Sequence, residues 1–249
     1  MKTSLKQGIV AVMVSITLTH CAPPDSFDEV DAYNDALSSA ALAYGAQSGL
    51  AWQADKINAV CESHARQLDQ IYAFGQLMLP QSITPPVLQE SRHQYFQQDS
   101  ETVRTSDRNI DIIKPAAFVT TTPSWRQYLT MHFEKPKQPH QSVLPHNQKE
   151  KELWNQKVNE GWHHGVQQAH DVFEDALGLL NRDFTGMALY HSLIATGLIT
   201  PPYAEPSSLG TTGDEQSMRI NEQLIRITEQ AKLNPHRPQH WQPAVQVDS

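Results

Sequence analysis

The sequence predicts an α+β fold that is predominantly helical. Apolar residues recur every three or four positions through two long stretches, about 26–79 and 147–197, which is the spacing of an amphipathic helix. Two other stretches, about 102–119 and 209–228, are rich in β-favouring residues around polar or glycine-rich centres, which favours β-hairpins. We therefore expect residues 26–249 to form a single domain of amphipathic helices with two hairpins.

The first helical stretch has a clear start and a clear end in the sequence. Ser26 and Glu29 match a capping box, and the apolar positions that follow form a helical stripe. The stripe continues to about residue 79, where Pro80 and then Pro85 and Pro86 end it. Cys61 lies in this apolar row, so we interpret it as a small buried core residue rather than a reactive thiol.

The middle of the chain changes character. The segment TVRTSDRNIDII, residues 102–113, places β-favouring residues on both sides of a polar centre, which indicates a hairpin that PAAFVTT extends. PSWRQYL, residues 123–129, is typical of a short capped helix. A Pro-rich connection over residues 134–146 follows, and its prolines exclude long regular structure.

The last third predicts helices and then a second hairpin. The apolar stripe from Gln148 is strongly amphipathic, and Asp183 is expected to cap a further helix that stops at Gly197. LGTTGD supplies a Gly-rich turn, and MRINEQLIRIT alternates around a polar Asn-Glu-Gln centre, which favours a hairpin. Residues 232–249 are expected to be an extended tail.

Glycine recurs beside large apolar residues within the predicted helices. The segments are SGLAWQ, EGWHHG and FTGMALY. A helical glycine costs about 1 kcal/mol relative to alanine, so we expect another backbone to approach closely at these positions. That backbone could belong to the same chain or to a partner subunit. Trp125, Trp154 and Trp162 are expected to be largely buried.

The N-terminus has the layout of an export signal. Lys2 and Lys6 precede an apolar run of roughly ten residues, where a bilayer-spanning helix needs about twenty. We interpret residues 1–20 as a signal peptide. The segment LTHC resembles the lipobox of bacterial lipoproteins, which makes Cys21 the expected lipidation site and residues 21–25 a tether. The alternative is ordinary cleavage of the signal peptide, in which Cys21 has no role in processing. His20 departs from the lipobox pattern, because a small residue normally precedes the cysteine.

Composition argues against several functional classes. The formal charge is −8, and loss of Lys2 and Lys6 with the signal peptide would take it to −10, so direct nucleic-acid binding is not expected. If Cys21 is modified or removed, Cys61 has no partner within the chain, so a disulfide scaffold is excluded. No nucleophile elbow, Walker loop or dinucleotide fingerprint is present, and LGTTGD lacks the lysine of a phosphate loop. We therefore expect no enzymatic activity and no cofactor.

The histidine-rich segment EGWHHGVQQAH is the strongest candidate for metal chemistry. It contains His163, His164 and His170, with Glu160 before them. A zinc-binding helix places two ligands at i and i+4, whereas His163 and His170 are about 10 Å apart along a helix axis. Packing or solvent-facing histidines are the favoured interpretation, so no metal is expected. A periplasmic metal-binding protein or hydrolase that uses these three histidines stays the alternative function.

Nine segments follow one another in order along most of the chain: GLAWQADKIN, LDQIYAF, PPVL, FVTTTPSWRQYL, GWHHGVQQA, DFTGMALYHSLI, LGTTGD, MRINEQLIRIT and WQPAV. The series resembles the DotC family, lipoproteins of type IVB secretion systems of the Dot/Icm kind and of IncI-type conjugative transfer systems. No single segment is diagnostic of the family; the resemblance depends on the whole series.

The resemblance implies a structural lipoprotein, palmitate-bearing at Cys21, in the outer-membrane core complex of a secretion or conjugation channel. It would be lipid-anchored in the outer membrane and face the periplasm. Its implied partners are a second lipoprotein and a secretin-like outer-membrane protein, in a ring-shaped hetero-oligomer. A free-standing solute-binding lipoprotein is a further alternative.

Overall fold

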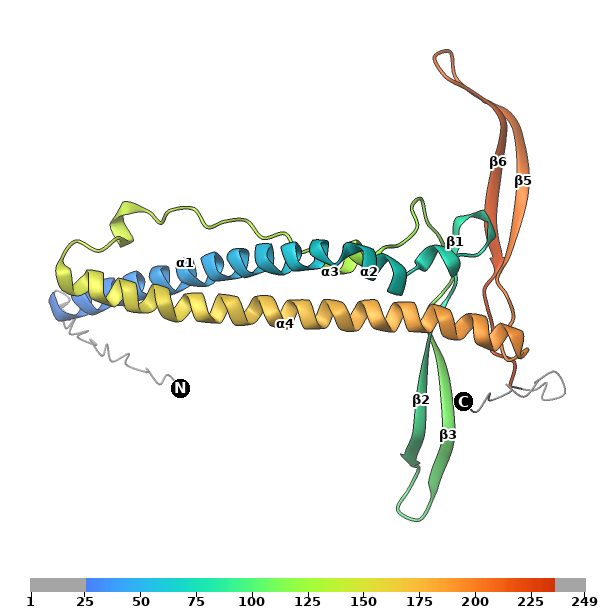
Figure 1. Cartoon of the computed structure of the whole chain (residues 1–249), viewed down its shortest axis with the longest axis horizontal. Helices are drawn as coiled ribbons and strands as arrows, with labels where there is room; N and C mark the ends of the chain where they lie inside the picture. The colour runs from blue at the N-terminus through green and yellow to red at the C-terminus, as the bar shows by residue number, and fades with distance from the viewer. Residues whose placement is uncertain (1–25, 236–249) are drawn as a thin grey trace, which may run out of the picture.

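Two long helices lie side by side and run in the same direction along most of the molecule (Figure 1). The computed structural model describes residues 26–235, and in it α1 (Ser26–Ser63) pairs with α4 (Gln148–Ala195). Contacts ascend together along both helices: Gly45 meets Val158, and Gly49 meets Trp162. The α+β, predominantly helical class predicted from the sequence is confirmed.

The first helical stretch is shorter than predicted. α1 ends at Ser63, α2 (Ala65–Ile71) continues in nearly the same direction, and the two 3-10 turns η1 (Phe74–Gln76) and η2 (Pro80–Ser82) follow (Figure 1). Regular α-helix therefore stops at Ile71, before the predicted limit near residue 79. Gln81 has a φ of 63°, which a helix interior does not allow.

A long connection returns the chain along α1 so that α4 can start at the same end. It follows the short helix α3 (Trp125–Leu129), where Ser124 precedes the helix without a capping hydrogen bond, and it contains only the 3-10 turn η3 (Gln141–Val143). The Asn58 amide donates to the Met131 carbonyl at 2.7 Å, and the Tyr33 hydroxyl donates to the Leu144 carbonyl at 3.0 Å. These bonds hold both ends of the connection on α1.

α4 is one continuous helix. Asn147 caps it, because the side-chain oxygen of Asn147 accepts from the Glu150 amide at 2.9 Å. The prediction that Asp183 starts a further helix is wrong, since Asp183 lies inside α4 and is 1% exposed. The Asp183 carboxylate accepts hydrogen bonds from Lys114 and Tyr128, which belong to other elements. The aspartate therefore makes a tertiary contact instead of capping a helix.

Two antiparallel hairpins project from the helix pair on opposite sides (Figure 1). The first pairs β2 (Val87–Gln97) with β3 (Val103–Lys114), and the second pairs β5 (Tyr203–Gly213) with β6 (Met218–Glu229). A small third sheet pairs β1 (Ile83–Thr84) with β4 (Ala117–Phe118). Two hairpins were predicted, but their turns lie elsewhere.

The predicted turns fall in the middle of strands. Residues 102–113 were expected to fold back on themselves, whereas residues 103–114 form a single strand whose partner is β2. LGTTGD, residues 209–214, was expected to be a turn, whereas residues 209–213 lie within β5, and the polar Asn-Glu-Gln centre at 221–223 lies within β6. The second turn is at Asp214–Ser217, where the Asp214 amide donates to the Ser217 carbonyl at 2.8 Å.

The buried core is divided into two clusters around α4. The larger cluster joins α1, α3 and α4 and includes Phe74, Trp125 and Leu180, and the smaller surrounds Tyr190 near the end of α4. Trp125 is 1% exposed, as predicted. Trp154 and Trp162 are only half-buried, which corrects the expectation that they are largely buried. A two-helix layer has no third helix to cover them, and they pair with Tyr44 and Trp52.

Candidate assembly surfaces

Glycines at four-residue spacing bring α1 and α4 into backbone contact. A Cβ at Gly45 would overlap the Val158 carbonyl, and one at Gly165 would overlap the Ala46 carbonyl. Gly49 and Gly161 are in the same situation against the opposite helix. The four glycines thus place Cα hydrogens against carbonyl oxygens, a contact worth about 0.5–1 kcal/mol each. The predicted close approach is confirmed, and the second backbone is in the same chain.

Asp183 is the centre of the junction between the helix pair and the first hairpin. Its Oδ2 accepts from Lys114 Nζ at 2.5 Å and from the Tyr128 hydroxyl at 2.9 Å. Its Oδ1 accepts from Arg182 Nη2 at 2.9 Å. Lys114 ends β3, Tyr128 belongs to α3, and Asp183 belongs to α4. One buried carboxylate therefore fastens three elements together.

The protonation of this junction follows from its contacts. Burial raises the pKa of Asp183, but hydrogen bonds from Lys114, Arg182 and Tyr128 outweigh burial and leave the pKa below its ordinary value. Burial, together with the hydrogen bond to Asp183, raises the pKa of Tyr128 to about 12. At neutral pH the carboxylate is charged and the phenol is protonated, which is the combination that the hydrogen bonds require.

Gly186 lies one turn beyond Asp183 and supports the same junction. A Cβ at Gly186 would lie 2.5 Å from the Leu88 carbonyl oxygen and 2.6 Å from Val87 Cγ1. The start of β2 therefore lies directly against α4. This is the close approach that the FTGMALY segment predicted, and it fixes the base of the first hairpin on the helix.

The second hairpin is attached at the same end of α4. Ala231, just after β6, packs with Tyr190, Leu193 and Ile199 in the smaller core cluster. The Gln230 side-chain amide donates to the Ala116 carbonyl and accepts from the Ala116 amide, both at 3.1 Å. Because Ala116 follows β3, this pair of hydrogen bonds ties the base of one hairpin to the base of the other.

Two buried tyrosines provide a matched test of this region. The Tyr190 hydroxyl has no hydrogen-bond partner among the described residues, whereas the Tyr128 hydroxyl donates to Asp183. Because an unpaired buried hydroxyl costs about 1–3 kcal/mol, Tyr190→Phe is expected to raise the free energy of unfolding by about 1 kcal/mol. Tyr128→Phe is expected to lower it by about 2 kcal/mol. Urea unfolding of both variants measures this, and a loss above about 1 kcal/mol in Tyr190→Phe would contradict it.

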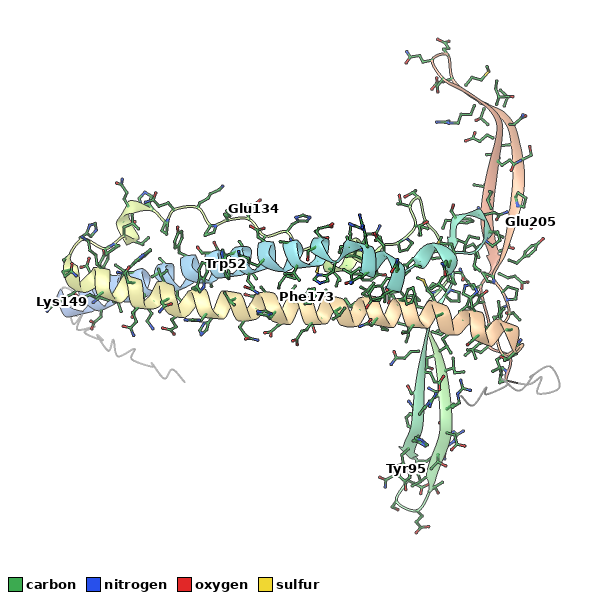
Figure 2. All side chains as sticks on the ribbon, in the orientation of Figure 1. Trp52, Tyr95, Glu134, Lys149, Phe173 and Glu205 are labelled. Atoms are coloured by element: carbon green, nitrogen blue, oxygen red, sulfur yellow. The ribbon has the colours of Figure 1, made fainter. Side chains whose placement is uncertain are left out.

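Beyond their bases, the hairpins expose apolar side chains to solvent on a structure that has no core of its own. On the first hairpin Tyr95 is 72% exposed and Phe96 63%, and on the second Met218 and Ile220 are each 67% exposed. Figure 2 shows Tyr95 near the far end of the first hairpin, well away from the helix pair. A two-stranded ribbon is marginally stable alone, so these arms are suited to contact with other subunits.

The middle of the first hairpin carries a cluster of charges. Glu90 accepts from Arg92 at 2.8 Å on its own strand and from Arg108 at 2.8 Å across the ladder. Hydrogen bonds from Arg108 and then Arg92 lower the pKa of Glu90. The cross-strand pair of Glu90 and Arg108 stabilises the ribbon where it has left the helix pair.

The residues singled out for metal chemistry do not form a site. His163, His164 and His170 are exposed on α4, and His170 Nε2 is hydrogen-bonded to the Gln53 amide at 3.0 Å. Among residues 26–235 no group of three or more histidine, cysteine or acidic side chains is arranged to hold a metal ion. Cys61 is buried and free, and burial raises its pKa, which agrees with a core role. Cys21 and the predicted signal peptide lie outside the described residues.

Sequence reasoning missed the two features that place the hairpins. Asp183 was read as a cap because aspartate is common there, although its position in an unbroken apolar stripe is a signal for a buried polar contact. The strand at residues 87–97 was missed because it lacks alternation beyond Leu88. In the described part of the chain, no helix combines the length and the apolar character that crossing a bilayer requires.

The described part of the chain is a paired-helix rod with two uncovered β arms (Figure 1). Residues 31–243, well over half of the chain, match the TraI family of the type IV secretory system, described as conjugal DNA-protein transfer. The chain therefore belongs to this family of conjugal type IV secretion proteins. Among curated proteins, no match is found.

Proposed function

We propose that the chain is a structural subunit of the outer-membrane core complex of a type IVB conjugation or secretion channel, akin to the DotC lipoproteins. The observation that carries the proposal is the match to a conjugal type IV secretion family over residues 31–243. Support comes from the architecture, since both hairpins hold their exposed apolar residues away from the helix pair. Such arms provide contact area for neighbouring subunits.

In this proposal Cys21 is acylated and anchors the chain to the outer membrane from the periplasmic side. The partners are a second lipoprotein and a secretin-like outer-membrane component, in a ring-shaped hetero-oligomer. The subunit acts as a scaffold and performs no catalysis. The formal charge of −8 supports contact with proteins rather than with the transported DNA, because phosphates are bound by basic surfaces.

Co-purification tests the scaffold role. The full chain is isolated in detergent from the outer membranes of donor cells, and its mass and associated proteins are measured. A large assembly with at least two other transfer proteins is expected. A monodisperse single subunit would contradict the proposal. Cys21→Ser is the control for anchoring: it is expected to abolish incorporation of labelled palmitate and to release the chain from the membrane.

Shortening the first hairpin tests whether it acts as an assembly arm. Arg92 and Arg108 are directly opposite, so residues 93–107 can be replaced by Asn-Gly, which closes a two-residue hairpin turn. The removed residues lie outside both core clusters, so the melting temperature is expected to change by only a few degrees. Transfer frequency is expected to fall by at least about a hundredfold. Wild-type transfer by the shortened protein would exclude a role for this arm.

A further inference from the structure

We propose that the free edge of β6 is a docking site for the β6 strand of a second copy of this chain. The two strands would pair antiparallel about a two-fold axis at Leu224, giving a four-stranded sheet from two hairpins. This inference does not depend on the secretion role, because it concerns only self-association of the purified chain.

The two edges of the second hairpin differ in what they can accept. β5 and β6 form a two-stranded sheet, so each has one edge without a strand partner among the described residues. Pro206 lies within β5, and proline lacks the amide hydrogen that an added strand would need. β6 contains no proline. The β5 edge is therefore blocked, and the β6 edge is open.

Pro206 also indicates which amides of β6 point outward. It is opposite Ile225, and a proline is compatible with an antiparallel ladder when its nitrogen faces away from the partner strand. Ile225 then directs its amide and carbonyl toward the free edge, and so does Gln223. In the proposed dimer Gln223 and Ile225 of one copy exchange hydrogen bonds with Ile225 and Gln223 of the other. Leu224 faces Leu224 of the second copy across the axis.

The charges of β6 fit this register. A strand that pairs with its own copy across a two-fold axis places residues of the same face opposite each other, so opposite charges must be an even number of residues apart. Glu222 and Arg226 are four apart and flank Leu224 symmetrically. Each Glu222 would therefore face Arg226 of the second copy, which forms two equivalent ion pairs beside the Leu224 contact.

The neighbouring strand extends the same row of charges. Within one chain Arg226 is opposite Glu205, and Glu222 is opposite Gly210, which has no side chain. Glu222 is half-buried and accepts from the Thr212 hydroxyl, and it lacks a cation partner within the described residues. The dimer would supply that cation and would place Arg226 between two carboxylates. Leu224, which is 46% exposed, would be covered by its own copy.

The β3 edge of the first hairpin lacks this complementarity. On β2, Glu90 and Arg92 are two residues apart, but they already pair with each other, and Glu90 also pairs with Arg108. On β3 the cations Arg104, Arg108 and Lys114 each lie an odd number of residues from the acids Asp107 and Asp111. Those side chains point to opposite faces and cannot meet across a two-fold axis. β3 therefore offers no self-pairing register of this kind. On β6 the register is limited toward the turn by Asn221, whose φ of 58° and adjoining register shift mark a bulge.

Charge reversal in two separate variants tests the proposal. Glu222→Arg and Arg226→Glu each place like charges opposite each other in a homodimer, so each full-length variant is expected to self-associate at least about tenfold more weakly than wild type by analytical ultracentrifugation. Mixing the two variants restores both ion pairs, and the mixture is expected to dimerise like wild type. Asp107→Arg, on β3, is the control and should not change self-association.

Recovery on mixing also shows that both variants are folded. A monomeric wild-type chain, or a mixture that stays monomeric, would overturn the proposal. The register is tested by Leu224→Cys, because a non-hydrogen-bonded antiparallel pair brings the two Cβ atoms close enough for a disulfide. Mild oxidation is expected to link two chains at position 224, whereas Ser207→Cys on β5 should give no link. Linking at position 207 rather than at position 224 would show that the chains dock through β5, which would overturn the proposal.

Discussion

Replacing Gly165 with leucine is expected to separate α1 from α4 and to lower the free energy of unfolding by about 3 kcal/mol or more. The reason is that a Cβ at this position overlaps the Ala46 carbonyl and lies 2.7 Å from the Leu50 amide nitrogen. Backbone atoms on both sides prevent the helices from accommodating a side chain without moving apart. Chemical denaturation of the purified protein measures the change.

Gly178 is the matched control, because it belongs to the same helix and, apart from the backbone of its own helix and its chain neighbours, nothing lies within 4 Å of its Cβ position. Gly178→Ala is expected to raise the free energy of unfolding by up to about 1 kcal/mol, through helix propensity alone. Gly165→Ala is expected to have the opposite sign. If both alanine variants were stabilising, the close contact of the two helices would be refuted.

Asp183→Asn is expected to lower the free energy of unfolding by about 3 kcal/mol. The amide keeps the shape of the side chain but removes the charge that pairs with Lys114 and Arg182, and breaking a buried ion pair costs about 3–5 kcal/mol. The lower end applies because Lys114 is half exposed and can be rehydrated. Asp175→Asn, an exposed position on the same helix, should change stability by less than about 0.5 kcal/mol.

The same residue gives stability a defined pH dependence. The pKa of Asp183 is lower in the folded protein than in the unfolded chain, where the pKa of an aspartate is about 3.9. Its contribution is therefore complete above about pH 5 and is lost as the pH falls through the folded value. Between these limits the free energy of unfolding of wild type should fall more steeply than that of Asp183→Asn. Equal slopes would show that Asp183 is not charged in the native state.

The helices could be predicted because a helix that buries one face has apolar residues at every third or fourth position of its sequence. α1 and α4 each bury one stripe against the other, and the glycines that interrupt those stripes marked the crossing. The hairpin strands could not be placed in the same way. Most of β3 meets water on both faces, so polar residues such as Asp107 and Asn109 occupy mid-strand positions and resemble a turn.

No local sequence pattern indicates that α4 runs parallel to α1. Short connections favour antiparallel neighbours, whereas the bonds that Asn58 and Tyr33 make to the returning chain show that this connection runs back along α1. The junction at Asp183 depends on that direction, since it brings Lys114 and Tyr128 to the C-terminal part of α4. Tertiary geometry, rather than local pattern, therefore decided where the hairpins stand.

The parallel pairing of α1 and α4 has a consequence for how the chain folds. Gly45 and Gly49 meet residues that are synthesised more than a hundred positions later, so the crossing depends on a long loop closure rather than on neighbouring segments. A chain that has been made or exported only as far as the connection presents an unpaired glycine face on α1. The core can therefore fold only after α4 is complete, because α4 is the main packing partner of α1.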